Sequence, residues 1–385
     1  MKKIGILTYF SDQNPGTFLQ AYSMLTAVAN RFPDSRVEII DYLFRRSMFH
    51  LRKGHLNLNR LVEEYVLYRR YKRIQQQFLV KSSTGIVSSD YDVVAEFIEK
   101  NNYDMVIVGG DTVLDIFHTF SIEGKLPTLI FWLPPRLKCK KVVFSASVNA
   151  LTYDRLKETL RKMLSESIAD FDLVGVRDEI SYKLMESLGL KNSPKLAVTP
   201  DPTFTFDIDY SYVDKLLKAR AISFKAPTLG ISLSWKLPVC KQIIKYYKSK
   251  GFRVISLGYN KYADVCLVDL MPFEWAGIYK YFTLTITDRF HGTIFSLKNN
   301  TPVVTVDCSK GRFTPEGLSK TYCLLKLFNL EKTNHINVGK IRDFADVTAI
   351  TDAAVKTFDC NMVEQTLITL RRNFNDFLDR TALLL

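Results

Sequence analysis

Short runs of apolar and β-branched residues alternate with amphipathic segments along most of the chain. Strands are expected at 1–9, 37–41, 105–108, 141–147 and 173–178, and helices between them at 18–31, 92–100, 153–167 and 180–188. Strands that follow one another with a helix between them pair in parallel, and the helices cover both faces of the sheet. The alternation therefore predicts an α/β fold with a parallel sheet.

A second unit of the same kind follows after an interruption near residues 206–226. Strands are then expected at 228–233, 253–257, 284–287 and 302–306, with helices at 239–250 and 272–279. Because 385 residues exceed what a single core usually supports, we expect two domains, at 1–205 and 206–360. A final helix within 361–385 is expected to pack back on the first domain. The cleft between the two sheets is the default place for a ligand.

The cysteines and the apolar runs limit the cellular setting. The six cysteines are widely scattered, without the paired spacing of a metal site or the density of a disulfide-rich secreted protein. No apolar run is long enough to span a membrane, and the apolar stretch at residues 4–9 is too short for a signal peptide. We therefore expect a protein of the reducing cytoplasm that requires no metal ion.

Much of the net charge of +13 is concentrated in one segment. The segment 42–80, which we call the basic arm, interleaves the cations Arg45, Arg46, Lys53, Arg60, Arg69, Arg70, Lys72 and Arg73 with the aromatic residues Tyr42, Phe44, Phe49, Tyr65, Tyr68 and Tyr71. Two interpretations stay open: a solvated helix whose aromatic residues face the core, and a helix that binds an anionic membrane surface. A nucleic-acid partner is not expected, because no zinc spacing or recognition motif accompanies the arm.

One polar cluster falls at the junction between a predicted strand and a predicted helix. Residues 281–286 are typical of a buried strand, a helix is expected over 292–298, and Arg289 and His291 lie between them. In open α/β sheets, ligands bind at such junctions. Arg289 offers a planar fork for a carboxylate or a phosphate, and His291 offers a proton near neutral pH. The alternative is structural: a salt-bridged arginine and a helix-capping histidine.

Several segments, in the same order along the chain, resemble the polysaccharide pyruvyl transferase family. They are residues 4–9 with Asn14, Gly16 and 19–22, the strand end 108–111, 176–178 with Ser181, 201–203, and 288–293. The last segment, Asp-Arg-Phe-His-Gly-Thr, is the most specific. The resemblance implies two facing Rossmann-like domains with parallel sheets, in the manner of GT-B glycosyltransferases. It also implies transfer of a pyruvyl group from phosphoenolpyruvate to sugar hydroxyls, usually as a cyclic ketal, with release of phosphate.

On this resemblance, the residues divide into three groups. His291 and Asp111 would be catalytic, Arg289, Arg177, Phe290, Gly292 and Thr293 would bind phosphoenolpyruvate, and Asn14, Gly16 and Thr17 would bind the acceptor. Phosphoenolpyruvate carries a carboxylate and a phosphate, so its site needs at least two fixed cations. Ketal formation needs an acid that protonates the methylene carbon. No cofactor is required beyond phosphoenolpyruvate as the donor substrate.

For three of these positions, a structural interpretation also stays open. Arg177 could instead pair with Asp178 or Glu179 at a helix start. Asp111 could be an N-cap after a glycine pair, or it could orient the sugar and accept its hydroxyl proton. The loop 14–17 is either an ordinary turn or a ligand site at a helix N-terminus.

The chain departs from the family pattern in two loops. Pro15 stands where the family usually has an aromatic residue, and residues 110–113 replace a Ser-Asp-Gln-like run. Whether these loops make the family's usual acceptor contacts therefore stays open. Residues 201–203 are expected to form a structural turn. No chemical role is assigned to His50, His55, His118 and His335.

The sequence thus predicts a cytoplasmic pyruvyl transferase that modifies a saccharide for a surface polysaccharide, such as an exopolysaccharide or a capsule. Whether the acceptor is attached to a lipid carrier, with the basic arm at the inner face of the membrane, is left open. Two other functions also stay open. One is a GT-B glycosyltransferase that uses a nucleotide sugar, because a fold does not fix a function, and the other is a non-catalytic scaffold at the membrane.

Overall fold

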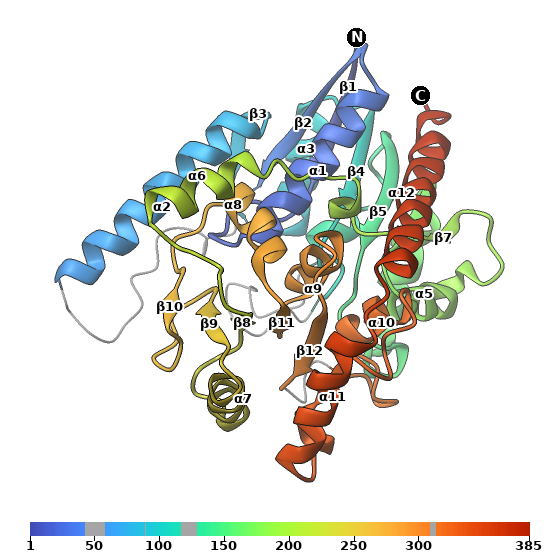
Figure 1. Cartoon of the computed structure of the whole chain (residues 1–385). Coiled ribbons are helices and arrows are strands. Elements are labelled where there is room, and N and C mark those ends of the chain that lie inside the picture. The colour runs from blue at the N-terminus through green and yellow to red at the C-terminus, as the bar shows by residue number, and fades with distance from the viewer. Residues whose placement is uncertain (43–57, 89, 117–128, 309–312) are drawn as a thin grey trace. The chain divides into compact units, whose positions relative to one another are not determined.

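The computed structural model describes residues 1–42, 58–88, 90–116, 129–308 and 313–385 (Figure 1). The chain divides into two compact units. The first unit comprises Met1–Phe206 and Arg371–Leu385, and the second comprises Asp207–Leu370. Each unit has a parallel β-sheet and helices of its own.

The first unit is built on a seven-stranded parallel sheet. Its strands are β1 (Lys2–Leu7), β2 (Ser35–Tyr42), β3 (Lys81–Ile86), β4 (Met105–Gly109), β5 (Lys140–Ala146), β6 (Leu173–Val176) and β7 (Leu196–Val198), in the spatial order β3-β2-β1-β4-β5-β6-β7. β1 is central, because Ile4 lies opposite Val37 of β2 on one side and Met105 of β4 on the other. β4 is buried along its whole length, as expected for a strand covered on both faces.

The helices of the first unit connect these strands. They are α1 (Pro15–Arg31), α2 (Leu58–Phe78), α3 (Tyr91–Lys100), α4 (Glu158–Ala169) and α5 (Glu179–Met185), with short 3-10 or π turns at Ile130–Trp132, Tyr153–Arg155, Glu186–Leu190 and Pro202–Phe204.

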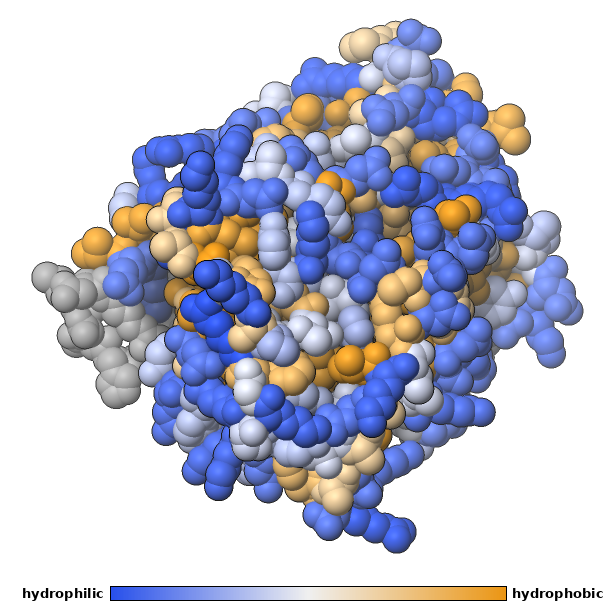
Figure 2. Space-filling view, in the orientation of Figure 1, coloured by the Kyte–Doolittle hydropathy of each residue, from blue (hydrophilic) through white to orange (hydrophobic). Residues whose placement is uncertain are grey.

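Charged and polar side chains cover most of the face seen in Figure 2, and apolar residues interrupt them in smaller areas.

The C-terminal helix α12 (Cys360–Ala382) contributes its last turns to the first unit. The ring of Phe374 stacks on Phe144 of β5 with centroids 4.6 Å apart, and the ring of Phe377 lies 4.8 Å from the same ring. Gly175 of β6 permits this approach, because a Cβ there would lie 2.7 Å from the Phe377 ring. The helix therefore packs its aromatic residues directly on the sheet.

The second unit is built on a six-stranded parallel sheet. Its strands are β8 (Thr228–Ser232), β9 (Arg253–Ser256), β10 (Val265–Cys266), β11 (Leu284–Thr287), β12 (Val303–Asp307) and β13 (His335–Asn337), in the order β10-β9-β8-β11-β12-β13. Its helices are α6 (Ser211–Ala219), α7 (Pro238–Ser249), α8 (Pro272–Gly277), α9 (Phe290–Lys298), α10 (Lys320–Lys326) and α11 (Phe344–Lys356), with 3-10 turns at Ile278–Tyr281 and Val338–Lys340. Ile243 of α7 and Val347 of α11 belong to one buried cluster with Ile286 of β11.

Each sheet contains one topological switch point, where the strand order reverses. In the first sheet it lies between β1 and β4, and in the second it lies between β8 and β11. The register places Leu7 opposite Val108 in the first pair, and Ser232 opposite Thr287 in the second. Ligands of open α/β sheets bind outside the carboxyl ends of the strands at such points. The loops that follow β1, β4, β8 and β11 are therefore the candidate ligand-binding segments.

The predicted fold class, with two Rossmann-like α/β domains and parallel sheets, is confirmed. Several boundaries differ. The first helix begins at Pro15, three residues before the predicted start, because Asn14 caps it and proline fits the first helical position. The helix predicted at 153–167 is interrupted, because Leu156 has an extended backbone between a 3-10 turn and α4.

Some elements were not expected from the sequence. β3 carries a polar sequence, Lys-Ser-Ser-Thr-Gly-Ile, which lacks the apolar alternation of a strand. α6 lies inside the predicted interdomain segment, and α10 and α11 fall in a region for which no element was predicted. Among the described residues, no helix combines the length and the hydrophobicity needed to cross a bilayer.

Replacing Phe374 with alanine should destabilise the first unit. Phe374 is fully buried on Phe144, so we expect the free energy of unfolding to fall by about 3–5 kcal/mol, the usual cost of removing a buried phenylalanine ring. Chemical denaturation followed by intrinsic fluorescence measures the change. Leu383→Ala, at an exposed position on the same segment, is the matched control and should change stability little. Equal effects of the two substitutions would contradict the packing described for α12.

Candidate functional site

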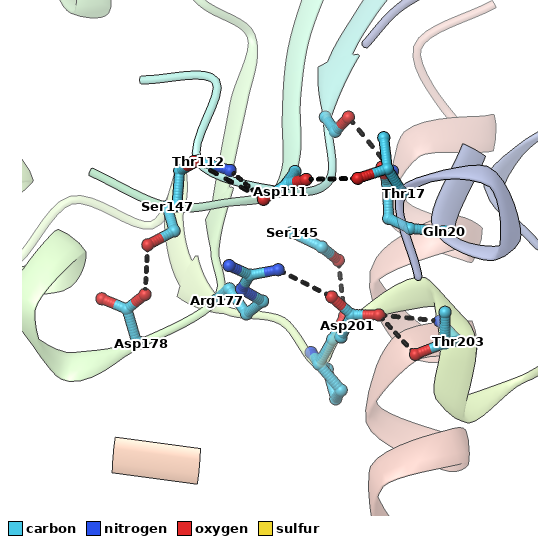
Figure 3. Close-up of polar contacts among 12 residues, drawn as sticks. Thr17, Gln20, Asp111, Thr112, Ser145, Ser147, Arg177, Asp178, Asp201 and Thr203 are labelled. Atoms are coloured by element: carbon cyan, nitrogen blue, oxygen red, sulfur yellow. Dashed lines mark hydrogen bonds and ion pairs between the residues drawn. The ribbon is translucent and has the colours of Figure 1, made fainter. Parts of the chain in front are cut away.

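The first switch point gathers the predicted acceptor-binding residues. Asn14 is the N-cap of α1, and its Oδ1 accepts a hydrogen bond from the Gly16 N–H at 3.0 Å. Thr17, in the first turn of α1, donates from Oγ1 to Asp111 Oδ2 at 3.3 Å (Figure 3). The loop predicted at 14–17 is therefore the start of a helix, and it contacts Asp111.

Asp111 follows β4 closely and has a left-handed backbone, with φ of 52°. Its Oδ1 accepts from the Thr112 N–H at 2.8 Å, and its carbonyl oxygen accepts from the Ser147 N–H at 2.9 Å. A turn rather than a helix follows over residues 111–116, so Asp111 is not the N-cap of a helix. These bonds hold the carboxylate at the carboxyl end of β4, beside the first turn of α1 (Figure 3).

Glycine at position 110 is required by this geometry. Gly110 has φ of +68°, and a Cβ there would lie 1.5 Å from Gln20 Nε2. Gln20 is fully buried and joins the two strands of the switch point: its Nε2 donates to Gly109 O at 3.4 Å, and its Oε1 accepts from Thr8 Oγ1 at 3.3 Å. The position of Asp111 is therefore fixed by packing as well as by the backbone.

Asp12 lies in the same β1–α1 loop and was not identified from the sequence. Burial raises the pKa of its carboxyl group and the negative charge of Asp111 raises it further, while the Lys72 ammonium opposes the shift. A carboxyl group whose pKa is shifted by burial and by a neighbouring carboxylate is a common feature of active sites. The available signal was the position of Asp12 in the loop that carries Asn14.

Arg177 follows β6 and is buried. Its Nη1 donates to Asp201 Oδ2 at 2.8 Å, and the two side chains are 3% and 0% exposed. Asp201 Oδ1 also accepts from the N–H and Oγ1 of Thr203, at 3.0 and 2.6 Å, so residues 201–203 form the expected turn (Figure 3). Asp178 caps α5 by accepting from the Ser181 N–H at 2.8 Å. Arg177 is thus oriented by a buried ion pair with Asp201.

The second switch point carries Arg289 and His291. Arg289 is the N-cap residue of α9, its side chain is 64% exposed, and its Nε lies 3.3 Å from Asp288 Oδ1. An ion pair at such an exposed position contributes little, about 0–1 kcal/mol. The salt bridge foreseen in the structural interpretation therefore exists, but it leaves the guanidinium accessible to an anion.

His291 lies in the first turn of α9, which begins two residues earlier than predicted. Its side chain is buried, and its ring meets the Phe290 ring edge-on with centroids 5.5 Å apart. A Cβ at Gly292 would lie 2.8 Å from Thr287 Oγ1, so glycine allows α9 to start close to β11. Thr293 Oγ1 donates to Arg289 O at 3.2 Å. His291 is therefore part of the helix and not its cap.

The predicted site residues fall into two groups, one in each unit. Asn14, Gly16, Thr17, Asp111 and Arg177 belong to the first unit, and Arg289, Phe290, His291, Gly292 and Thr293 belong to the second. Each group lies at the carboxyl edge of its own sheet. Convergence of Arg177, Arg289 and His291 on a single ligand stays a prediction.

His335, which was given no role, belongs to a buried cluster around Asp307 at the end of β12. Asp307 Oδ2 is 2.8 Å from His335 Nε2, and it accepts from Ser319 Oγ and Thr321 Oγ1, both at 2.6 Å. Burial alone would raise the pKa of Asp307, but the hydrogen bonds from His335, Ser319 and Thr321 outweigh it and lower the pKa. The cluster ties the N-terminus of α10 to the sheet.

The described part of the basic arm is α2. Tyr71 is buried, as the core-facing interpretation expects, whereas Tyr65 and Val66 are exposed on another face with Arg69 and Arg73. Arg45, Arg46, Lys53, Phe44 and Phe49 lie outside the described residues, as do His50, His55 and His118. Tyr42 belongs to β2 and not to the arm. One face of α2 therefore presents apolar and cationic side chains to solvent.

A metal site needs several ligating side chains close together. Within the described part of the chain, no group of three or more His, Cys, Asp or Glu side chains has the arrangement needed to hold a metal ion. The six cysteines are free thiols. That the reaction requires no metal ion stays a prediction.

Replacing Asp12 with asparagine should stabilise the protein at neutral pH. The folded-state pKa of Asp12 is raised, so its ionisation penalises the folded state as pH rises from the unfolded pKa of about 3.9 through the folded value. The neutral amide removes this penalty, so the melting temperature should rise at pH 7 and change little at pH 3.

Asp104 provides a control of opposite sign. The Lys3 N–H, as the largest cause, lowers the pKa of the Asp104 carboxyl group. Its contribution to stability is present above the unfolded pKa and is lost as pH falls through the folded one. Asp104→Asn should therefore lower the melting temperature at pH 7. A destabilising Asp12→Asn at pH 7 would contradict the environment described for Asp12.

Solved structures with a similar fold include several enzymes of sugar nucleotides. UDP-GlcNAc 2-epimerase from Methanocaldococcus jannaschii superposes with a TM-score of 0.53 at 12% identity, covering 96% of this chain and 99% of that one. A co-structure of MnaA with UDP from S. aureus gives a TM-score of 0.51 at 14% identity, with 95% and 91% covered. These likenesses support the predicted GT-B-like fold and nothing further.

Comparison of the sequence with known proteins identifies the family. No curated protein matches the chain. A family model described as polysaccharide pyruvyl transferase matches residues 14–310. This match includes every predicted site residue, from Asn14 to Thr293. The chain therefore belongs to the polysaccharide pyruvyl transferase family.

Proposed function

We propose that this chain transfers the pyruvyl group of phosphoenolpyruvate to hydroxyl groups of a saccharide, forming a ketal and releasing phosphate. One observation carries the proposal: an exposed Arg289 guanidinium lies two residues from a buried His291 at the switch point of the second sheet. A cationic fork beside an imidazole suits an anionic substrate that must be protonated. Membership of the family supports the reaction class.

The donor presents a carboxylate and a phosphate on a small carbon skeleton. Arg289 would pair with one anionic group, and Arg177 would pair with the other. The ion pair with Asp201 would keep the Arg177 guanidinium in a fixed orientation, because breaking such a buried pair costs about 3–5 kcal/mol. The proposal requires that both arginines reach one donor molecule.

The proton transfers would be divided between His291 and Asp111. His291 donates a proton to the methylene carbon, which becomes a methyl group while positive charge develops on the neighbouring carbon. A saccharide hydroxyl oxygen attacks that carbon, and Asp111 accepts the hydroxyl proton. Phosphate then leaves with the C–O bonding electrons, and a second hydroxyl oxygen attacks to close the ketal while its proton passes to the departing phosphate. The products are the ketal and inorganic phosphate; Asp111 releases the proton it gained to solvent, and His291 takes one up again.

The acceptor would bind at the first switch point. Asn14, Gly16 and Thr17 form the first turn of α1, whose N-terminus favours an oxygen-rich ligand. The Thr17–Asp111 hydrogen bond links this turn to the proposed base. Pro15 occupies the first helical position, so this chain would contact the acceptor through the turn without an aromatic side chain.

The exposed face of α2 supports a location at the membrane. Val62, Tyr65 and Val66 are exposed apolar residues, and Arg69 and Arg73 are exposed cations on the same helix. Such a face binds an anionic bilayer surface through buried apolar area and electrostatic attraction. A cytoplasmic enzyme held there would reach a lipid-linked precursor of an exopolysaccharide or a capsule.

A second candidate function is a GT-B glycosyltransferase that uses a nucleotide sugar. The observation that favours it is the fold, which this chain shares with the UDP-bound MnaA structure. The same pair of domains can host different reactions. The two candidate functions are therefore distinguished by which donor substrate the chain binds. Thermal stabilisation by uridine diphosphate without stabilisation by phosphoenolpyruvate would favour the glycosyltransferase.

Two substitutions at the second switch point should have different kinetic effects. His291→Ala should lower kcat by about 100- to 10,000-fold, as expected for loss of a general acid, while donor binding survives. Arg289→Ala should instead weaken phosphoenolpyruvate binding by about 1.5–3 kcal/mol, the scale of a hydrogen bond to a charged group. Phosphate release and the mass gain of a saccharide panel measure the reaction, and calorimetry measures donor binding.

Arg220→Ala is the matched control, because Arg220 lies at the C-terminal end of α6, where its guanidinium pairs with Asp269. This substitution should leave both kcat and the affinity for phosphoenolpyruvate unchanged. If His291→Ala and Arg289→Ala both retained wild-type kinetics, neither residue would have the proposed role in the reaction. Absence of phosphate release with every saccharide tested would reject the proposed donor.

Binding to vesicles tests the membrane contact. The wild type should sediment with vesicles that contain phosphatidylserine and remain in solution with pure phosphatidylcholine vesicles. The double substitution Tyr65→Ser/Arg69→Ser should weaken sedimentation, because it removes both an apolar and a cationic contact. Tyr212→Ser/Lys215→Ser, on α6, is the control. Equal sedimentation of the wild type with both lipids would exclude an electrostatic membrane contact.

A further inference from the structure

The loops that follow β8 and β9 in the second unit, together with the first turn of α7, carry a group of aromatic and cationic side chains. We call this group the aromatic–lysine platform, and it consists of Trp235, Lys236, Lys241, Tyr259, Lys261 and Tyr262. β8 and β9 are neighbours in the sheet. Their carboxyl ends therefore place both loops at the edge where α/β sheets bind ligands.

The side chains of the platform contact one another across the two loops. Lys261 Nζ lies 4.7 Å from the centroid of the Trp235 ring and 5.1 Å from that of the Tyr262 ring. Lys236 Nζ lies 5.9 Å from the Trp235 centroid, and the Tyr259 ring meets Trp235 edge-on at 6.3 Å. Cation–π contacts of this kind hold lysine ammonium groups against aromatic rings. The side chains of the platform thus form one continuous surface.

Within the part of the chain that the structure describes, no platform lysine forms an ion pair with an acidic side chain. Asp264, which follows the β9 loop, pairs with Lys248 at 2.5 Å and accepts from the Val254 N–H. Asp288, on the neighbouring β11 loop, pairs with Arg289. The three platform lysines therefore form a cationic patch, and a bound anion would relieve their mutual repulsion.

A buried asparagine makes the platform rigid. Asn260, between Tyr259 and Lys261, is 1% exposed. Its Oδ1 accepts from the Tyr262 N–H at 3.1 Å, and its Nδ2 donates to Cys240 Sγ of α7 at 3.4 Å. Tyr259, the residue before it, is 66% exposed. A large aromatic ring held in solvent by an anchored loop is a preformed contact surface, because little conformational entropy remains to be lost on binding.

The platform lies beside the proposed donor residues of the same unit. β8 pairs with β11 on the side opposite to β9, with Ser232 opposite Thr287. Trp235 comes three residues after Ser232, and Arg289 comes two residues after Thr287. A ligand on the platform would therefore extend toward Arg289 along one edge of the sheet.

We propose that the aromatic–lysine platform binds the phosphate-linked end of the acceptor saccharide. The sugar ring packs on the exposed ring of Tyr259, and the phosphate oxygens accept hydrogen bonds from Lys236, Lys241 and Lys261. This assignment rests on the proposed function, because it takes the saccharide as the acceptor of the pyruvyl group. Phosphoenolpyruvate has no ring that could pack on the aromatic side chains. A neutral saccharide has no anionic group that could pair with the lysines.

A nucleoside diphosphate shares the combination of a ring and a phosphate, but it fits the platform less well. A base gains most by stacking on open aromatic faces. The ammonium of Lys261 lies over both Trp235 and Tyr262. A saccharide can use the single exposed ring of Tyr259.

Binding measurements without phosphoenolpyruvate test the assignment. Calorimetry or ligand-observed NMR with the full chain compares four probes: glucose 1-phosphate, glucose, inorganic phosphate and uridine diphosphate. The wild type should bind glucose 1-phosphate more tightly than the other three. Lys236→Ala/Lys261→Ala should weaken its binding at least tenfold, the equivalent of about 1.4 kcal/mol. Tyr259→Ala should weaken it as well, whereas Tyr259→Phe keeps the ring and should retain the affinity.

Lys218→Ala/Lys245→Ala removes two exposed lysines outside the platform and should leave the affinity unchanged. Thermal melting confirms that the variants are folded. Undetectable binding of glucose 1-phosphate to the wild type, or equal binding by Lys236→Ala/Lys261→Ala, would overturn the assignment. Tighter binding of uridine diphosphate that depends on the same lysines would overturn it in favour of a nucleotide site. These binding measurements contain no phosphoenolpyruvate. They can therefore be interpreted even if the chain does not catalyse pyruvyl transfer.

Discussion

The reversal of strand order in a parallel sheet constrains where this protein can hold a ligand. At each switch point, two adjacent strands are followed by connections that leave toward opposite sides, so their carboxyl ends are open to side chains from both loops. β1 and β4 bring Asn14, Thr17 and Asp111 together in the first unit. β8 and β11 place Arg289 and His291 in the second. The proposed reaction uses side chains from both edges.

The first edge is held in a locally unfavourable arrangement. Asp111 has a left-handed backbone, and it raises the pKa of Asp12, which burial has already raised. Such arrangements persist only where the surrounding structure compensates for them. Gln20, which packs against Gly110 and donates a hydrogen bond to Gly109 O, provides that support. The position of Asp111 thus depends on the packing of α1 against the end of β4.

The fold class was predictable because strand–helix alternation is visible in short apolar runs, and the most specific motif was contiguous in sequence. β3 was not predictable, because its polar residues are stabilised by pairing with β2 rather than by an apolar pattern. The partner of Arg177 was missed because Asp201 is distant in sequence and reaches it only in the folded sheet. The aromatic–lysine platform was missed for the same reason, since its residues come from two segments, 235–241 and 259–262, that are separate in sequence.

The central claim is that His291 protonates the methylene carbon of a donor bound by Arg289. The most direct measurement is the reaction in deuterium oxide, followed by mass spectrometry of the saccharide product. We expect a ketal whose methyl group carries one deuterium from solvent, formed together with phosphate. A ketal methyl group without solvent deuterium, or a product in which the saccharide has gained a glycosyl unit instead, would contradict it.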